Sequence, residues 1–214
     1  MTSKTTELSL DEIFNLAKAS LLKHGANEEN AVAVANTVTN AERDGSLSHG
    51  LFRIPGYIKA LQSKKVDGSA KPEIEEVTPT IFRCDAKNGF APLAHKYSLK
   101  PLIEAAHKFG IAGVAIQRSH HFAALWPEVE TISENGLVGL TSVSYTPAVA
   151  PAGGTTALFG TNPMSFAWPR PGKNPIVFDM ATSSMAKGEI QIAARDGHSV
   201  PLGTGLSSSG ELTT

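Results

Sequence analysis

Three polar residues, Ser48, His49 and Arg53, have types and spacing that suit chemistry on a substrate carrying a carboxylate. If a helix begins near Ser48, His49 and Arg53 lie four residues apart and share one helix face. An arginine binds a carboxylate through two parallel hydrogen bonds, and a nearby histidine can exchange a proton with an adjacent atom. Ser48 then either hydrogen-bonds the imidazole or caps the helix. The same spacing also fits a capping serine, a surface histidine and a solvated arginine.

A second cluster, His120-His121-Phe122, follows the apolar run 111–117 and precedes a helix that opens near Pro127. Loops at the carboxyl ends of strands bind ligands in α/β folds, and a helix start offers free backbone N–H groups to a phosphate. Adjacent histidines also raise the question of a metal. Neighbours in an extended loop point to opposite sides, however, and no Cys or carboxylate accompanies them at ligand spacing. The cluster therefore predicts contact with a cofactor and no metal site.

The end of a predicted strand at 176–179 supplies a third cluster, in which Asp179 is followed by a Ser/Thr-rich loop and Lys187. Asp179 suits a ribose hydroxyl or a catalytic histidine, with helix capping as the alternative. Lys187 either meets a substrate carboxylate or is solvated. Thr161, in the tight turn 160–163, also presents a hydroxyl to a ligand.

Helices predicted over the first sixty residues must position the first cluster. Ser9 and Glu12 form a capping-box pattern before the apolar periodicity of 10–24, and a second helix is expected over 28–43. A third is expected from Ser48 to about Gln62, with an irregular early part at Pro55. The polar stretch 63–79 reads as loop and short extended pieces.

Strands alternate with helices in the rest of the chain. Strands are expected at 80–85, 111–117, 137–144, 164–168 and 176–179, and helices at 91–109, 127–136 and 184–195. This alternation predicts a mixed-sheet α/β architecture behind a helical N-terminal segment. We expect a substrate and catalytic side at 1–75 and a cofactor-binding region at 76–214. In the stretch 200–214 no final helix or strand is expected.

Composition excludes several classes of protein. The 214 residues carry 19 Lys and Arg against 20 Asp and Glu, and 41% of the residues are hydrophobic. A near-neutral chain with this apolar content is neither intrinsically disordered nor a general binder of nucleic acid. No apolar run approaches the roughly 18 residues of a membrane span, and the first residues lack the apolar core of a signal peptide. A cytoplasmic protein is therefore expected. Cys84, the single cysteine, reads as a buried thiol in a strand.

The signatures of several common enzyme folds are absent. The chain contains no GxGxxG, GxxxxGK[ST], HExxH or GxSxG motif. These absences disfavour a Rossmann dehydrogenase, a P-loop enzyme, a zincin and an α/β-hydrolase.

Four stretches, at 41–57, 113–130, 157–170 and 178–190, together resemble the malate/L-lactate dehydrogenase type 2 family. The resemblance implies a nicotinamide-binding fold that is not of Rossmann type. Many hydroxyacid dehydrogenases of the family carry Asn-His-Phe/Tyr-Gly where this chain has His-His-Phe-Ala-Ala. The SHHFAALWPEVE stretch is most similar to members that use NADPH to reduce the cyclic imines Δ1-piperideine-2-carboxylate and Δ1-pyrroline-2-carboxylate.

The resemblance also implies a role for each matching residue. Ser48 would be a relay partner and His49 the proton donor. Arg53, Thr161, Lys187 and Gly188 would bind substrate, and the cofactor would contact His121, Phe122, Ala123, Ala124, Leu125, Asp179, Met180 and Ala181. The implied assembly is a homodimer.

Two other functions remain open at this stage. One is an NAD-dependent dehydrogenase of malate, lactate or a related 2-hydroxy acid, which would share the carboxylate-binding feature. Because family members continue past the equivalent of Thr214, we also expect a truncated form, and a ligand-binding remnant without turnover is the second alternative.

Overall fold

The computed structural model describes residues 6–121, 123–207 and 209–214. The chain forms two compact units, Met1–Ala124 and Leu125–Thr214. Both combine helices with small sheets, so the predicted mixed α/β class is confirmed. Packing divides the chain at residue 124, because the helices before residue 75 and the first sheet share contacts through α4 (Ala91–Phe109). The division at residue 75 into a catalytic and a cofactor side stays a functional prediction.

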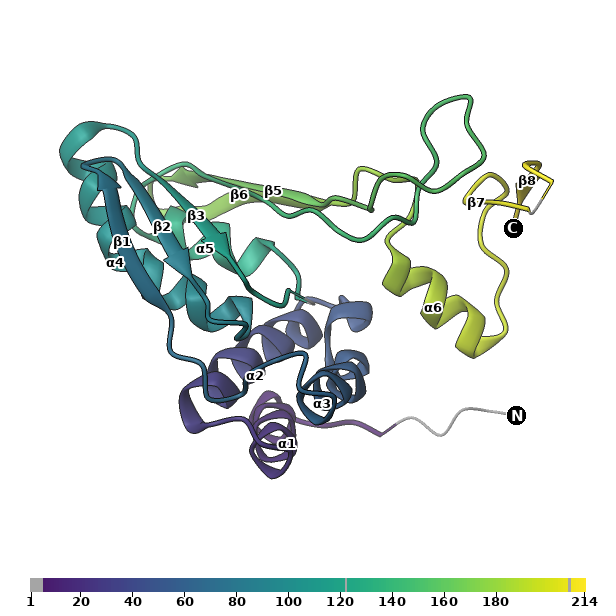
Figure 1. The fold of residues 1–214 in the computed structure, drawn as a ribbon, viewed down its shortest axis with the longest axis horizontal. Coiled ribbons are helices and arrows are strands. Elements are labelled where there is room, and N and C mark those ends of the chain that lie inside the picture. Colours follow the sequence, from purple (N-terminus) through teal and green to yellow (C-terminus); the bar gives the residue numbers. More distant parts are fainter. Residues whose placement is uncertain (1–5, 122, 208) are drawn as a thin grey trace. The chain divides into compact units, whose positions relative to one another are not determined.

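The first unit is built on α1 (Leu10–Lys23), α2 (Glu28–Arg43) and α3 (Ile54–Gln62) (Figure 1). The Ser9–Glu12 capping box is present, so the expected start of the first helix is confirmed. The three helices share one apolar core. Its fully or almost fully buried members include Ala17, Leu21, Val34, Val38 and Tyr57. Complementary apolar faces at helical spacing thus set the packing of these helices.

The predicted third helix is interrupted near its start. Two short 3₁₀ turns, η1 (Leu47–His49) and η2 (Leu51–Arg53), come before α3. Between them Gly50 has φ −84° and ψ −142°, which lies outside the helical region. The expectation that His49 and Arg53 share one α-helical face is therefore wrong. Pro55 sits in the first turn of α3, where a proline breaks no helical hydrogen bond.

A three-stranded sheet completes the first unit. Its strands, in spatial order, are β1 (Glu73–Thr78), β2 (Ile81–Asp85) and β3 (Gly113–Gln117). β1 pairs antiparallel with β2, whereas β2 and β3 are parallel and connect through α4. Loop and short extended pieces were expected over 63–79, and β1 is such an extended piece, six residues long and paired in the sheet. This edge strand is rich in glutamate and mostly exposed, so it lacks the alternation of apolar residues that marks a half-buried strand.

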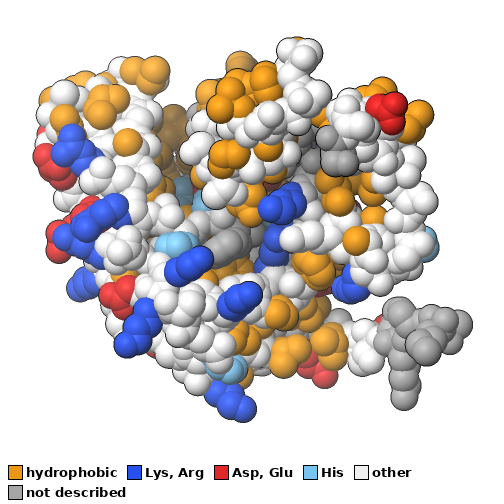
Figure 2. Space-filling model, turned by 45° about the vertical axis from the view of Figure 1, so that its right-hand side comes forward, with side chains coloured by type: hydrophobic (Ala, Val, Ile, Leu, Met, Phe, Trp, Pro, Cys, Tyr) orange, Lys and Arg blue, Asp and Glu red, His pale blue; other side chains and the backbone are white. Residues whose placement is uncertain are grey.

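The second unit begins with α5 (Trp126–Glu134), which packs on an antiparallel sheet of β4 (Gly139–Ser142), β5 (Met164–Arg170) and β6 (Lys173–Met180). Val129, Gly139 and Ala167 are buried between helix and sheet. The other face of the sheet is apolar and exposed, and hydrophobic side chains are visible on the molecular surface (Figure 2). Its exposed members are Leu140, Met164, Trp168, Ile176, Phe178 and Met180.

Helix α6 (Lys187–Asp196) and a small hairpin end the described chain. The hairpin pairs β7 (Gly205–Leu206) with β8 (Leu212–Thr213). The expectation that 200–214 contains no final helix or strand is therefore wrong. These strands have two residues each, too short for a periodic pattern. Among the described residues, no helix is long and apolar enough to cross a membrane. Cys84 is buried, as predicted, and burial raises the pKa of its thiol.

Candidate active site

The imidazole of His49 is held by two serine hydroxyls. Ser48 Oγ lies 3.0 Å from His49 Nδ1, and Ser46 Oγ lies 3.3 Å from the same nitrogen. Ser48 is fully buried inside η1, whose N-cap is Ser46, so Ser48 contacts the imidazole and is not the capping residue. These two contacts fix the orientation of an imidazole, a group that can exchange a proton with a ligand near neutral pH. Sequence reasoning missed Ser46, although its spacing three residues before His49 is typical of one 3₁₀ turn.

Arg53 lies at the end of η2 and is half-buried. Its guanidinium carbon is 5.8 Å from the ring centroid of Phe52. Its charge also acts on the buried hydroxyl of Tyr57, whose ring packs edge-on against Phe90 at 5.4 Å between centroids. Burial raises the pKa of Tyr57 far above its usual range, and Arg53 opposes this only in part. The buried Tyr57 side chain is therefore uncharged and acts as a neutral neighbour of the Arg53 guanidinium.

The His120-His121 loop is tied to the turn that follows β2. Arg118 has φ +52°. Its guanidinium donates to the Asp85 carboxylate through Nε, 2.8 Å from Oδ1, and through Nη2 to Oδ2. The His120 N–H donates to Gly89 O at 2.9 Å, and the His120 carbonyl accepts from the Ala91 N–H at 3.0 Å. Arg118 also holds the pKa of Asp85 well below its usual range. Because β2 and β3 are parallel, these contacts gather at their carboxyl ends.

The remaining members of this cluster have different environments. His121 is half-buried, whereas Ala123, Ala124 and Leu125 are buried. Phe122 lies outside the described residues. The Asp85–Arg118 pair was not singled out from sequence, although opposite charges following two adjacent parallel strands are a usable signal.

Asp179 caps the start of α5 from the end of β6. Its Oδ2 accepts the N–H of Leu125 at 2.7 Å and the N–H of Trp126 at 2.9 Å. Pro127 has no N–H, and the N–H of Glu128 donates to Leu125 O at 3.0 Å. The prediction that this helix start offers free N–H groups to a phosphate is therefore wrong, because a carboxylate of the chain occupies it.

Thr161 and the loop after β6 lie side by side in the second unit. The Thr161 carbonyl accepts from the N–H of Thr182 at 2.9 Å and from its hydroxyl at 3.1 Å. Lys187 is the first residue of α6, and its Nζ lies 5.7 Å from the ring centroid of Tyr145. Gly188 is buried, Met180 is exposed and Ala181 is half-buried. The start of α6 has no side-chain cap, which leaves the positive end of the helix beside a lysine.

The structure thus brings predicted residues together within each unit. Ser48 and His49 meet in the first unit, and Leu125 and Asp179 meet in the second. Across residues 6–121, 123–207 and 209–214, no three His, Cys, Asp or Glu side chains gather as a metal-ligand set.

Comparison with known proteins assigns these features to a family. The sequence profile described as malate/L-lactate dehydrogenase matches residues 8–214. The chain belongs to this family.

Among its relatives, the chain is 45% identical over 207 residues to the Δ1-pyrroline-2-carboxylate/Δ1-piperideine-2-carboxylate reductase of Pseudomonas aeruginosa, covering 97% of this chain and 62% of that protein. The crystal structure of Δ1-piperideine-2-carboxylate reductase from Pseudomonas syringae superposes with a TM-score of 0.93 at 46% identity, covering 98% and 63% of the two chains. Malate dehydrogenase from Entamoeba histolytica gives a TM-score of 0.91 at 30% identity, covering 98% and 58%. The chain therefore spans about three fifths of the length of these relatives.

Proposed function

We propose that the protein reduces a cyclic imine that carries a carboxylate, in the class of Δ1-piperideine-2-carboxylate and Δ1-pyrroline-2-carboxylate, with NADPH. The observation that carries this proposal is the His49 imidazole, which Ser48 and Ser46 hold at Nδ1. His49 lies two residues before η2, and η2 ends at Arg53. The similarity to reductases of these imines, at 45–46% identity, supports the choice of substrate.

His49 supplies the proton that this reaction needs. Reduction adds a hydride to C2 and a proton to the ring nitrogen, so the C=N bond becomes a C–N single bond of a secondary amine. The serine hydroxyls fix the orientation of the ring that would give this proton to the substrate nitrogen. A bound nicotinamide cofactor supplies the hydride.

Arg53 would hold the substrate carboxylate and so fix which face of the ring is presented. A bidentate pair restricts both position and rotation of a carboxylate. Neutral Tyr57 adds no competing negative charge next to the guanidinium. Thr161, Lys187 and Gly188 are proposed as further substrate contacts, and the uncapped start of α6 suits an anionic group.

The donor set of the chain fits a nicotinamide dinucleotide in part. Asp179, which accepts the N–H groups of Leu125 and Trp126 through Oδ2, is proposed to contact a ribose hydroxyl of the cofactor. His121 would supply a donor from the loop after β3, with Phe122, Ala123, Ala124, Leu125, Met180 and Ala181 as apolar contacts. NADPH rather than NADH and a homodimer complete the proposal, because the family resemblance implies them. A cytoplasmic location is proposed with them.

One assay tests the proposal. The purified chain is given NADPH with Δ1-piperideine-2-carboxylate, with pyruvate or with oxaloacetate, and NADPH absorbance is followed. Oxidation with the imine supports the proposal, and His49→Ala should then lower kcat far more than it changes binding, while Arg53→Ala mainly raises KM. Unchanged kcat in His49→Ala would remove His49 from the role of proton donor.

The similarity to the Entamoeba malate dehydrogenase favours a second candidate, a 2-hydroxy acid dehydrogenase. Oxidation of NADPH or NADH with the oxo acids alone would select this function. Silence with all three substrates would contradict activity of the 214-residue chain and support a ligand-binding role.

A further inference from the structure

We propose that Glu42 is a positioning residue for the candidate active site, because its carboxylate holds the turn that joins His49 to Arg53. The role of that turn in catalysis rests on the proposed function. The geometry of the turn itself is independent of it.

A single side chain-to-backbone hydrogen bond defines the contact. The N–H of Leu51 donates to Glu42 Oε1 at 2.6 Å. Leu51 opens η2, which ends at Arg53, and the residue before it, Gly50, closes η1, which ends at His49. The carboxylate thus binds the chain at the junction between the proton donor and the proposed carboxylate-binding arginine.

The turn approaches Glu42 so closely that a side chain at residue 50 would have to displace the Glu42 carboxylate. A Cβ added to Gly50 would lie 2.5 Å from Glu42 Cδ and 2.8 Å from Glu42 Cγ, inside van der Waals contact. Gly50 allows this close approach through its missing Cβ and not through its φ of −84°, which is open to any residue. Glu42 and Gly50 therefore act as one fitted pair.

The base that carries Glu42 is firmly packed. Glu42 lies in the last turn of α2, beside buried Ala41 and one turn after buried Val38. The same helix end also holds the start of the turn, because the N–H of Ser46 donates to Ala41 O at 2.8 Å. Residues 46–51 are thus fixed at both ends to α2.

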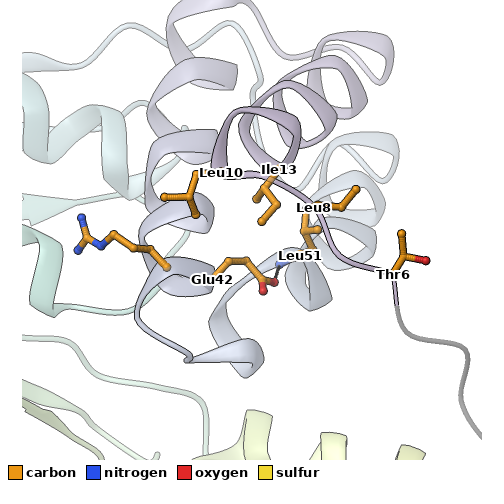
Figure 3. Close-up of a pocket in the computed structure, with 7 residues that line it drawn as sticks. Thr6, Leu8, Leu10, Ile13, Glu42 and Leu51 are labelled. Atoms are coloured by element: carbon orange, nitrogen blue, oxygen red, sulfur yellow. Dashed lines mark hydrogen bonds between the residues drawn. The ribbon is translucent and has the colours of Figure 1, made fainter.

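The side chain of Glu42 lines a cavity of about 440 Å³. Figure 3 shows its carboxylate directed toward Leu51. Leu10, Ile13 and Leu51 supply apolar walls of this cavity. Loss of the carboxylate would leave the Leu51 N–H without its acceptor. We expect the turn to shift, and a shift of about 1 Å in a catalytic group can lower the rate about 100-fold.

The first experiment compares Glu42→Ala with Glu42→Gln in the full chain. Gln keeps an acceptor oxygen at the same reach, so it should rescue most of the activity, whereas Ala should lower kcat/KM about 10- to 100-fold. Glu104→Ala, on the exposed side of α4, is the matched control and should leave kcat/KM unchanged. Equal loss in Glu42→Ala and Glu42→Gln, or no loss in either, would overturn the proposal.

A second readout does not depend on activity, so that a failed proposed function can be told apart from a failed positioning role. The amide proton of Leu51 and the side-chain nitrogens of His49 are followed by NMR. Glu42→Ala should move both the Leu51 and the His49 signals, and Glu42→Gln should keep them near those of the wild type. If Glu42→Ala leaves the His49 signals in place, the positioning role is wrong even in an active enzyme.

Gly50→Ala tests the fitted pair directly. The added methyl group should displace the Glu42 carboxylate and reproduce the changes in the Leu51 and His49 signals seen in Glu42→Ala. In the double variant Glu42→Ala/Gly50→Ala the clash is gone, so these changes should be no larger than in Glu42→Ala alone. Additive changes would show that Gly50 acts independently of Glu42 and would overturn the pair.

Discussion

The two units differ in how they bury apolar surface. In the first, Leu21, Val34 and Val38 are fully buried between three helices. In the second, α5 covers one face of the β4–β5–β6 sheet, while Trp168 and Leu140 on the other face are 53% and 66% exposed. One unit therefore has a core enclosed by its own helices, and the other has a sheet covered on one side within the described residues.

This difference bears on how each unit holds its functional groups. The turn with His49 rests on α2, whose apolar face lies in the enclosed core. In the second unit, individual side-chain hydrogen bonds hold the corresponding groups in place, as at Asp179 and Thr182. Packing is the larger stabilising contribution, so we expect the first unit to be the more resistant to unfolding.

Leu21→Ala should have the largest effect. Removing a fully buried leucine leaves a cavity and should lower the free energy of unfolding by about 2–5 kcal/mol in urea titrations. Leu22→Ala, at a neighbour that is 38% exposed, is the control and should cost clearly less. Equal losses would contradict an enclosed core at this position.

Asp179→Ala should destabilise the second unit by a smaller amount. Two N–H groups at the start of α5 lose their acceptor, which costs about 1–3 kcal/mol. Hydrogen exchange of the Leu125 and Trp126 amides should accelerate. Asp179→Asn retains an acceptor oxygen and should protect these amides better than alanine does. Unchanged exchange in Asp179→Ala would contradict the capping role.

The Asp85–Arg118 pair predicts a pH dependence in the first unit. Because the pKa of Asp85 is lowered in the folded protein, its contribution to stability is present above its unfolded value of about 3.9 and is lost as the pH falls through the folded pKa. Asp85→Asn should therefore make the free energy of unfolding fall less steeply as the pH is lowered into the acid range. Arg118→Gln should have a similar effect, and an unaltered slope in both variants would contradict the pairing.

Trp168→Ser should have the smallest effect of the four. An exposed side chain on the open sheet face contributes little, so the free energy of unfolding should change by no more than about 0.5 kcal/mol. Val129→Ala, on the covered face of the same sheet, should cost more than about 1 kcal/mol. A large loss in Trp168→Ser would show that this face is covered in solution, which would break the comparison.

Local signals in the sequence were enough for most helices. The Ser9–Glu12 box and the apolar spacing of 28–43 correspond to α1 and α2, and Gly110 ends α4 in the left-handed conformation, where glycine costs least. The short hairpin β7–β8 was not predicted, and the charged strand β1 was expected only as a short extended piece, because neither has enough residues with a clear alternation.

The candidate site was predictable in residue types more than in arrangement. Ser48, His49 and Asp179 were predicted as site residues because their types and their places in the sequence suit contact with a substrate or a cofactor. Ser46 and Glu42 were not, since a serine and a helix-terminal glutamate are ordinary surface residues until their partners are known.

By itself, the sequence determined the order of most elements, the helix ends and the chemical types available to the site. These follow from local propensity, capping and periodicity, which act within a few residues. The tertiary structure alone decided that the helical turns are interrupted at Gly50 and that the Ser46 and Ser48 hydroxyls contact His49 Nδ1. It also decided that Asp179 caps α5. The deciding bonds join Glu42 to Leu51, nine residues away, and Asp179 to Leu125, 54 residues away. Contacts between side chain and backbone over such separations leave no periodic trace in a sequence.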